Sequence, residues 1–496
     1  MTNTKFLFCV FDGLRRDLIR QDTMPNLNSF RRSWCDFPNS NSAFPSETRV
    51  QVSSFVTGAY AGGAGSSAES EEGGGHGIMA NVFYDLSLQL DKPLDTSDTN
   101  NMKHARQVYG RIQKAANLGE ILAGAGFNYS VLTTGKIGNA KLLNLEADKF
   151  RHKLFSIWGR DISSAAIDYD RIIRDFGPPP EQEFPNNMVT EYATKLLLEY
   201  FLCDVTTDVQ VIWYNEPDLS FHYRGIGAPE SLSTIRSIDE NFGKILDWWN
   251  AEGRSKGWHI IVVSDHAQIT TIKQINVIEE LRKGGFNAGI AVADGIDIAV
   301  KRSYSGQITV RDRNPKLIKR VLEFLQDQYW CGLTFTRTGL YGALCMADIN
   351  GLNERSPDIN YVMRTFDGVN EFGYPGLCYA DNPDIPHGGG IHGGLHKTEL
   401  NNLMVFGGDR FKREMIFDVP SSIVDVLPTI LCGLDVRRPK TIMGRSLNEV
   451  FLDGGDNPDW SERCIRASRN DYSQEMLIAE VQGGSCPYLR GGKRTS

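Results

Sequence analysis

Short apolar runs that alternate with longer amphipathic segments constrain the fold of this chain most strongly. The apolar runs lie at 5–11, 129–133, 209–214, 259–263 and 402–406, and each leads into a turn or a polar cluster. Helical spacing is found at 48–57, 113–124, 187–201, 231–250, 315–328 and 422–432. This repeat of strand and helix predicts an α/β fold, an αβα sandwich in which helices cover both faces of a central, mostly parallel sheet.

Between residues 271 and 384 the sequence departs from this alternation of strands and helices. Segments 296–301 and 306–311 predict short antiparallel strands, and a helix follows them. We interpret 271–384 as a smaller α+β cap. It is inserted into one core that comprises 1–270 and 385–455.

Two further segments have the composition of mobile chain. Residues 61–75 are rich in Gly, Ser and Glu, which predicts a flexible surface loop. Residues 456–496 form a polar C-terminal extension that closes on Gly-Gly-Lys-Arg-Thr-Ser. We expect the end of this extension to be disordered.

The charge balance narrows the class of substrate. The chain has 496 residues, a formal net charge of -8 and a pI of about 5.7. A nucleic-acid polymer is not expected as a substrate, because a protein that holds its backbone needs a basic field. A small anionic substrate is compatible with this charge, since bound metal ions can reverse the sign of an acidic pocket.

Three features predict a cytoplasmic protein without a membrane partner. The first apolar run ends at Phe11 and leads directly into Asp12, so it is interpreted as a buried strand rather than a signal peptide. No apolar run reaches the ~18 residues of a membrane span. The nine cysteines are odd in number and form no Cys-x-x-Cys pair, which is typical of reduced thiols. The sequence carries no signal for an oligomeric state.

Acidic and histidine residues follow the ends of three apolar runs. They are Asp12, Asp218, His222, Asp265 and His266. The carboxyl ends of the strands form the usual ligand site of an open α/β sheet, and both residue types bind metals. Asp218 and His222 are four residues apart, so one helical turn would bring them to a common point. Taken singly, each residue also fits an ordinary polar turn.

Thr48 opens the predicted helix 48–57, which ends at the pair Thr57-Gly58. The N-terminus of a helix favours a bound phosphate, so Thr48 is a candidate nucleophile toward a phosphate ester. The alternative is a plain N-cap, in which Ser46 or Thr48 satisfies free backbone donors. These residues alone leave the choice open.

Together with the histidine-rich stretch Pro386–His396, these motifs resemble the alkaline phosphatase superfamily. Its type I phosphodiesterase/nucleotide pyrophosphatase and phosphonoacetate hydrolase branches are the most similar. The shared signature is an Asp after the first strand, a nucleophile opening a helix, Asp-x-x-x-His, Ser-Asp-His and a late Gly-x-His-Gly motif. In many members the nucleophile lies nine positions before the Thr of a Thr-Gly pair, and this spacing selects Thr48 over Ser46.

The resemblance implies an alkaline-phosphatase-like fold and two divalent metal ions, with zinc favoured and manganese or iron as alternatives. The implied ligands of one ion are Asp12, Thr48, Asp265 and His266. The implied ligands of the other ion are Asp218, His222 and His392, with His396 and His387 as alternatives to His392.

The resemblance also implies contacts with the substrate. The stretch His76–Asp85 is similar to the phosphodiesterase pattern His-Gly-Ile-x-x-Asn-x-x-Tyr-Asp, whose Asn donates a hydrogen bond to a non-bridging phosphate oxygen. This role falls to Asn81. Further candidates for contact with a substrate anion are Lys136, Arg49 and His396. For the first two, a solvated lysine and a packing arginine are the alternatives.

These residues predict a two-metal phosphoric ester hydrolase of the phosphodiesterase/nucleotide pyrophosphatase type. It would act on a small anionic phosphate ester through a phosphothreonine at Thr48. The alternatives are a phosphonate hydrolase resembling phosphonoacetate hydrolase, a phosphomonoester hydrolase, and a non-catalytic metal-binding module on the same fold. A sulfatase of the formylglycine type is not expected, because the chain lacks its Cys-x-Pro-x-Arg motif.

Overall fold

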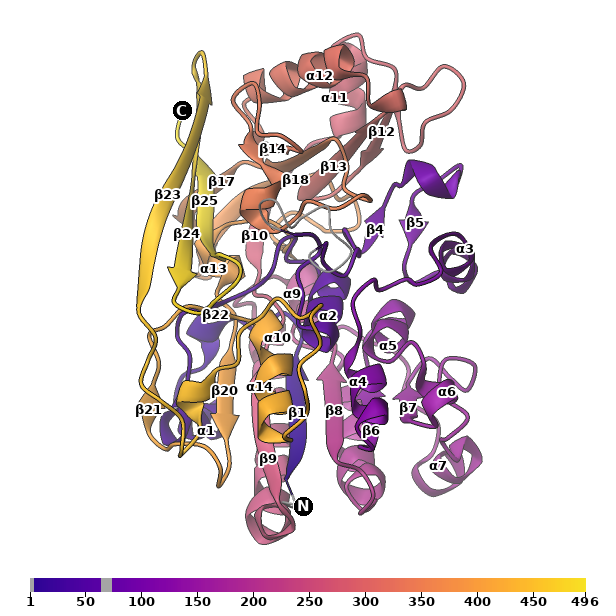
Figure 1. Ribbon diagram of the computed structural model, residues 1–496, viewed down its shortest axis with the longest axis vertical. Helices are drawn as coiled ribbons and strands as arrows, with labels where there is room; N and C mark the ends of the chain where they lie inside the picture. The colour runs from indigo at the N-terminus through magenta and orange to yellow at the C-terminus, as the bar shows by residue number, and fades with distance from the viewer. Residues whose placement is uncertain (1–3, 64–73) are drawn as a thin grey trace.

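The computed structural model describes residues 4–63 and 74–496, and an eight-stranded sheet forms its core (Figure 1). The sheet has the order β21-β2-β20-β9-β1-β8-β6-β7. Its parallel part consists of β9 (Trp258–Val263), β1 (Lys5–Phe11), β8 (Val209–Tyr214), β6 (Tyr129–Thr133) and β7 (Lys153–Ser156). Next to β9 lie antiparallel β20 (Met404–Gly407), then β2 (Cys35–Asp36) and β21 (Met415–Ile416). Each predicted core strand therefore corresponds to a strand of this sheet.

The alternation of side chains along β1 explains why both faces of the sheet are covered. Phe6, Phe8 and Val10 belong to one apolar cluster. This cluster includes α2 (Thr48–Thr57), α4 (Leu118–Gly124), α5 (Ile137–Leu143) and α14 (Val426–Gly433). Leu7, Cys9 and Phe11 of β1 belong to a second cluster with α1 (Pro25–Ser33), α8 (Asn187–Leu196) and α10 (Pro229–Trp248). The predicted αβα sandwich is confirmed.

The helix predicted over 113–124 begins later than expected. Asn117 and Glu120 form a capping box, in which each side chain accepts from the other residue's backbone N–H. This box starts α4 at Leu118 and leaves the preceding residues outside the helix.

A six-stranded sheet lies beyond the core, at the top of Figure 1. Its strands, in order, are β11 (Ala288–Gly289), β12 (Ile298–Lys301), β13 (Ser305–Val310), β16 (Ile359–Met363), β14 (Cys331–Thr336) and β15 (Leu344–Cys345). The apolar cluster of this sheet includes α11 (Val277–Lys283) and α12 (Pro315–Asp327). The predicted antiparallel pair is β12 and β13. The limits of the cap at 271 and 384 stay a prediction.

Smaller elements connect these two parts. A four-stranded sheet contains β17 (Thr365–Val369), β18 (Pro375–Ala380), β10 (Ile269–Gln274) and β19 (Gly390–Ile391). Two short pairs are β22 (Ser421–Ser422) with β3 (Ser40–Asn41), and β4 (Val82–Phe83) with β5 (Leu94–Asp95). The remaining helices named below are α3 (Thr99–Tyr109), α6 (Ala147–Phe150), α9 (Asp218–Arg224) and α13 (Lys397–Leu400). None of the described helices is both long and apolar enough to cross a membrane.

The C-terminal extension is an ordered antiparallel sheet, so the expected disorder of its end is wrong. Its strands are β23 (Trp460–Arg469), β24 (Tyr472–Val481) and β25 (Tyr488–Arg494), on the left of Figure 1. Met476 and Ile478 are buried and belong to the same apolar cluster as Phe335 of β14. The polar composition concealed a strand with one buried face. The loop predicted over 61–75 falls mostly outside the described residues.

Met476→Ala is expected to lower the free energy of unfolding by about 2–5 kcal/mol, because it leaves a cavity between this sheet and the cap. Leu477→Ala is the matched control, since the neighbouring side chain is 39% exposed whereas Met476 is fully buried. Urea unfolding curves measure both changes. Equal effects of the two substitutions would show that β24 does not pack on the cap.

Candidate metal centre

Three carboxylates meet at one edge of the core sheet. β1 lies between β8 and β9 in parallel register, so the three strands end at about the same level. Asp12 follows β1, Asp218 opens α9 after β8, and Asp265 follows β9. The backbone N–H of Asp218 donates to the carbonyl of Asp12 at 2.9 Å, which joins two of the strand ends directly. The predicted gathering of these acids is therefore present.

Three histidines, His222, His266 and His392, present their Nε2 atoms to these carboxylates. Nε2 of His266 lies 3.5 Å from Oδ1 of Asp12 and 3.2 Å from Oδ2 of Asp265. Nε2 of His222 and Nε2 of His392 lie 3.3 Å and 3.5 Å from Oδ1 of Asp218. The predicted Asp-x-x-x-His pair therefore faces one point from the single helical turn of α9.

The other ring nitrogen of each histidine is held by the backbone. The Nδ1 atoms of His222, His266 and His392 lie 2.7, 3.1 and 2.7 Å from the carbonyl oxygens of Gly390, Ala267 and Ser46. A carbonyl only accepts, so Nδ1 carries a proton and Nε2 is the nitrogen that faces the carboxylates. This arrangement is the usual support of metal-binding histidines.

Thr48 is the first residue of α2, and its hydroxyl faces this cluster. Its Oγ1 lies 3.2 Å from Nε2 of His266 and 3.5 Å from Oδ1 of Asp12. The N-cap position belongs to Glu47, whose side chain makes no capping bond. Ser46 points elsewhere, since its hydroxyl bonds to the backbone of the 393–394 segment. Neither Ser46 nor Thr48 is therefore the helix cap that the alternative interpretation required.

The ligand atoms form two groups that could each hold a metal ion. One group is Asp12, Asp265 and His266, and the other is Asp218, His266 and His392, with all ligand atoms of a group within 4.8 Å of one another. His222 lies outside both groups but against Asp218.

The chemistry of these groups fits a divalent cation. Oδ2 of Asp265 is buried and has no hydrogen-bond partner among the described residues. Burial and the neighbouring carboxylates raise the pKa of Asp12 well above its ordinary value, and burial raises the pKa of Asp265 to about 8. Burial also lowers the pKa of His266 well below its usual range, so the ring is neutral. Crowded carboxylates, an orphaned acceptor and neutral imidazoles are what a metal ion satisfies.

Two supporting side chains were not predicted. The indole N–H of Trp213 donates to Oδ2 of Asp12 at 3.1 Å, and Nε2 of Gln268 donates to Oδ1 of Asp218 at 2.5 Å. Gln268 lies two residues after the Ser-Asp-His motif, so that spacing could have drawn attention to it. Trp213 reaches Asp12 from the neighbouring strand, and no local pattern reveals such a contact.

The cluster opens into a cavity of about 240 Å³. Its wall includes Thr48, Asn81, Lys136 and Arg49, and also the aromatic side chains of Trp158, Phe184 and Tyr223. Arg49 is turned toward Asp95, at 3.0 Å, and toward Ser97, which supports the packing alternative for its guanidinium. Lys136 is exposed at the cavity, which fits both a contact with a substrate anion and a solvated lysine.

Of the three late histidines, only His392 reaches the cluster. His396 accepts from the backbone N–H of Thr398 at the start of α13, and its Nε2 lies 3.6 Å from Asp367. It neither lines the cavity beside Thr48 nor belongs to a ligand group, so the structure does not bring it together with the other predicted site residues. His387 is exposed and belongs to neither ligand group. Spacing alone could not separate these histidines.

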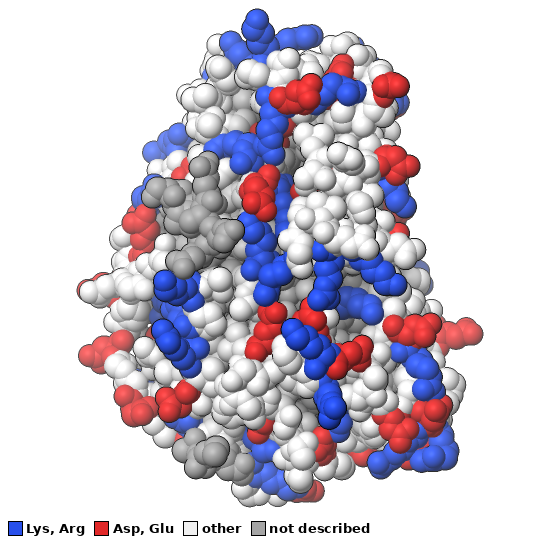
Figure 2. Space-filling view, turned by 45° about the vertical axis from the view of Figure 1, so that its right-hand side comes forward, with Lys and Arg blue, Asp and Glu red and all other residues white. Residues whose placement is uncertain are grey.

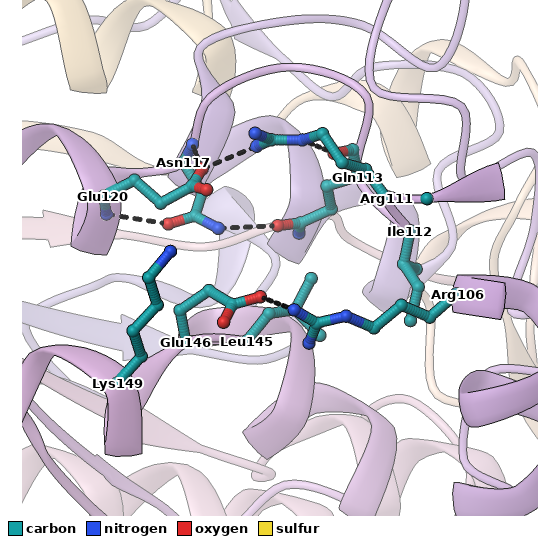
Figure 3. Close-up of a pocket in the computed structure, with 10 residues that line it drawn as sticks. Arg106, Arg111, Ile112, Gln113, Asn117, Glu120, Leu145, Glu146 and Lys149 are labelled. Atoms are coloured by element: carbon teal, nitrogen blue, oxygen red, sulfur yellow. Dashed lines mark hydrogen bonds and ion pairs between the residues drawn. The ribbon is translucent and has the colours of Figure 1, made fainter.

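A second cavity, of about 200 Å³, lies among α3, α4 and α6 (Figure 3). Its charged groups satisfy one another: Arg106 pairs with Glu146 at 2.7 Å, and Arg111 pairs with Glu120 at 2.6 Å. The cavity beside Thr48 differs, because its carboxylates have no such cationic side-chain partners among the described residues.

Comparison with known protein families gives a match over more than half of the chain. A family model described as type I phosphodiesterase/nucleotide pyrophosphatase matches residues 6–329. The chain belongs to this family. The resemblance seen in the motifs is thereby confirmed.

Individual members of the type I phosphodiesterase family are only distantly similar. The bis(5'-adenosyl)-triphosphatase enpp4 of Xenopus laevis is 22% identical over 263 residues, 53% of this chain. The match spans 46% of that relative, about half its length. Murine ectonucleotide pyrophosphatase/phosphodiesterase 5 shares the fold, with a TM-score of 0.60 and 17% identity over 88% of this chain and 96% of that chain. An inactive threonine-to-alanine variant of the murine protein, in complex with AMP, matches equally well.

His392→Ala is expected to lower the metal content of the purified protein, because it removes one ligand from the group around Asp218. His396→Ala should leave the metal content unchanged. Elemental analysis after dialysis against a metal buffer measures both variants. Loss of metal from the His396 variant alone would reverse the assignment.

Proposed function

We propose that this family member is a two-metal phosphodiesterase that cleaves a small anionic phosphate ester through a phosphothreonine at Thr48. The observation that carries the proposal is the position of the Thr48 hydroxyl, 3.2 Å from Nε2 of His266 and beside both ligand groups. A buried hydroxyl in that place is suited to attack on phosphorus.

The proposed ligands of one ion are Asp12, Thr48, Asp265 and His266, and those of the other are Asp218, His222 and His392. The mixture of imidazole and carboxylate donors favours zinc, and manganese or iron remain alternatives. When bound, two such ions supply Lewis acidity that acidifies a hydroxyl and stabilises the oxygen of a leaving group.

The residues of the chain then divide the reaction between them. Oγ1 of Thr48 forms a bond to phosphorus as the bond to the leaving oxygen breaks, and the hydroxyl proton passes to solvent. Asn81 donates from Nδ2 to a non-bridging oxygen. Water then attacks the phosphothreonine from the side that the leaving group vacated and restores the Thr48 hydroxyl. Two in-line displacements give net retention of configuration at phosphorus.

Two features support a small substrate with a nucleotide-like group. The structure of the inactive murine variant contains AMP, which supports both an essential threonine and a nucleotide product. On the face shown in Figure 2, Asp and Glu side chains lie among the Lys and Arg side chains, rather than leaving a continuous basic surface. Such a mixed surface suits a small anion better than a nucleic-acid backbone. Lys136, at the cavity, is proposed to contact the substrate anion.

We also propose a cytoplasmic location. In the described residues all nine cysteines are free thiols, which supports a reducing compartment. Cell fractionation with an antibody against the chain tests this proposal, and enrichment in the secreted fraction would contradict it.

Thr48→Ala is expected to abolish turnover of bis-p-nitrophenyl phosphate, because the nucleophile is lost while the ligands Asp265 and His392 stay in place. Ser46→Ala is the matched control and should keep measurable turnover, since Ser46 does not face the ligand cluster. Release of p-nitrophenol and metal content are measured for both variants. Undiminished turnover by the Thr48 variant would remove that residue as the nucleophile.

The wild-type protein is expected to prefer bis-p-nitrophenyl phosphate to p-nitrophenyl phosphate and to phosphonoacetate. Phosphate release and p-nitrophenol release give the three rates at matched concentrations. A monoester rate far above the diester rate would favour a phosphomonoester hydrolase, and turnover of phosphonoacetate alone would favour a phosphonate hydrolase. If no ester is turned over, the result would favour a non-catalytic metal-binding module on the same fold.

A further inference from the structure

Glu47 joins three segments of the chain beside the nucleophile. It directly precedes Thr48 and is buried. Its Oε2 accepts from the backbone N–H of Asn81 at 2.6 Å. Its Oε1 accepts from the ammonium group of Lys301, at the end of β12 in the second sheet. One carboxylate therefore connects the helix start at Thr48, the loop that carries Asn81 and the cap.

Hydrogen bonds fix the backbone and the amide oxygen of Asn81 and leave its Nδ2 group to contact a ligand. Its Oδ1 accepts from the backbone N–H of Arg49 at 2.8 Å, which fixes the orientation of the amide. Its backbone carbonyl accepts from Thr96, and its backbone N–H donates to Glu47. Nδ2 makes no hydrogen bond to the described residues, and Asn81 lines the cavity together with Thr48. The donor aimed at a phosphate oxygen is thus placed by the bonds around it.

Lys301, from the second sheet, supplies the positive charge that pairs with the Glu47 carboxylate. Lys301 is almost fully buried and also donates to the carbonyl of Ser305 at 3.2 Å. Gln307 of β13 donates to the carbonyl of Met79 at 2.8 Å, so a second side chain from the same sheet holds the loop before Asn81. A buried carboxylate that lost its ammonium partner would be uncompensated beside a bound anion.

We propose that Glu47 is a positioning residue, which with Lys301 sets Asn81 against the substrate and makes the site depend on the cap. Glu47 acts through Asn81 and does not itself touch the reacting atoms. The inference rests on the proposed function for the identity of the anion that Asn81 contacts. The positioning itself can be measured separately from catalysis.

The next residue of the chain provides a matched control. Arg302 also forms an ion pair with a buried acid, Asp381, at 2.7 Å. Neither Arg302 nor Asp381 lines the cavity beside Thr48. Lys301→Met and Arg302→Met therefore each remove one cation at the C-terminal end of β12, but only Lys301 contacts the nucleophile segment.

Lys301→Met and Glu47→Gln are each expected to lower kcat on bis-p-nitrophenyl phosphate about tenfold, because a small misplacement of Asn81 weakens its bond to the developing charge. KM and metal content should change less than about twofold. Arg302→Met should leave kcat within about twofold of wild type. In an Asn81→Ala background, Lys301→Met should have no further effect on kcat.

Hydrogen–deuterium exchange tests the same claim without activity. Backbone amides of the segment 76–83 should exchange faster in Lys301→Met than in wild type, and at the wild-type rate in Arg302→Met. Equal exchange in all three proteins would overturn the positioning role, as would additive losses of kcat in the Asn81→Ala background. If wild type turns over no ester, the proposed function fails, while the exchange rates still decide whether Glu47 and Lys301 position Asn81.

Discussion

The structure depends on the gathering of three carboxylates, the buried Asp12 and Asp265 and the half-buried Asp218, at one edge of the parallel sheet. Their mutual repulsion and loss of hydration oppose folding unless donors or cations offset them. The indole of Trp213 and the amide of Gln268 each supply one hydrogen bond, but Oδ2 of Asp265 receives no hydrogen bond from the described residues. Because the register of three strands sets these positions, the site and the core sheet are one structural unit.

The remaining parts of the site come from outside the sheet. His392 is brought in by the segment after β19, and its Nδ1 is tied to the carbonyl of Ser46, two residues before the nucleophile. Glu47 is tied to the second sheet through Lys301. The two residues before the helix start are thus held by side chains that lie 346 and 254 positions further along the chain. These contacts tie the segment before Thr48 to the second sheet and to the segment after β19.

Much of the core was predictable, because its signals are local in sequence. The buried run 5–11 and the polar residues after each strand reveal parallel strands whose ends share an edge, and the predicted Asp and His ligands follow from this. The contact between Lys301 and Glu47 spans 254 positions, so no spacing or periodicity announces it. The choice of His392 over His387 and His396 likewise depended on the path of the glycine-rich segment that carries them, which their spacing does not reveal. The C-terminal extension was misjudged because one face of β24 is polar, and composition averages both faces.

The central proposal is a covalent phosphoryl group on Thr48 during turnover. The most direct measurement is mass spectrometry of protein that is quenched in acid during turnover of bis-p-nitrophenyl phosphate and then digested. We expect a p-nitrophenyl phosphate group on the peptide that contains Thr48, with fragment ions that place it on this residue. Rapid turnover with no modified peptide, or with the group on another side chain, would contradict the assignment of Thr48 as the nucleophile.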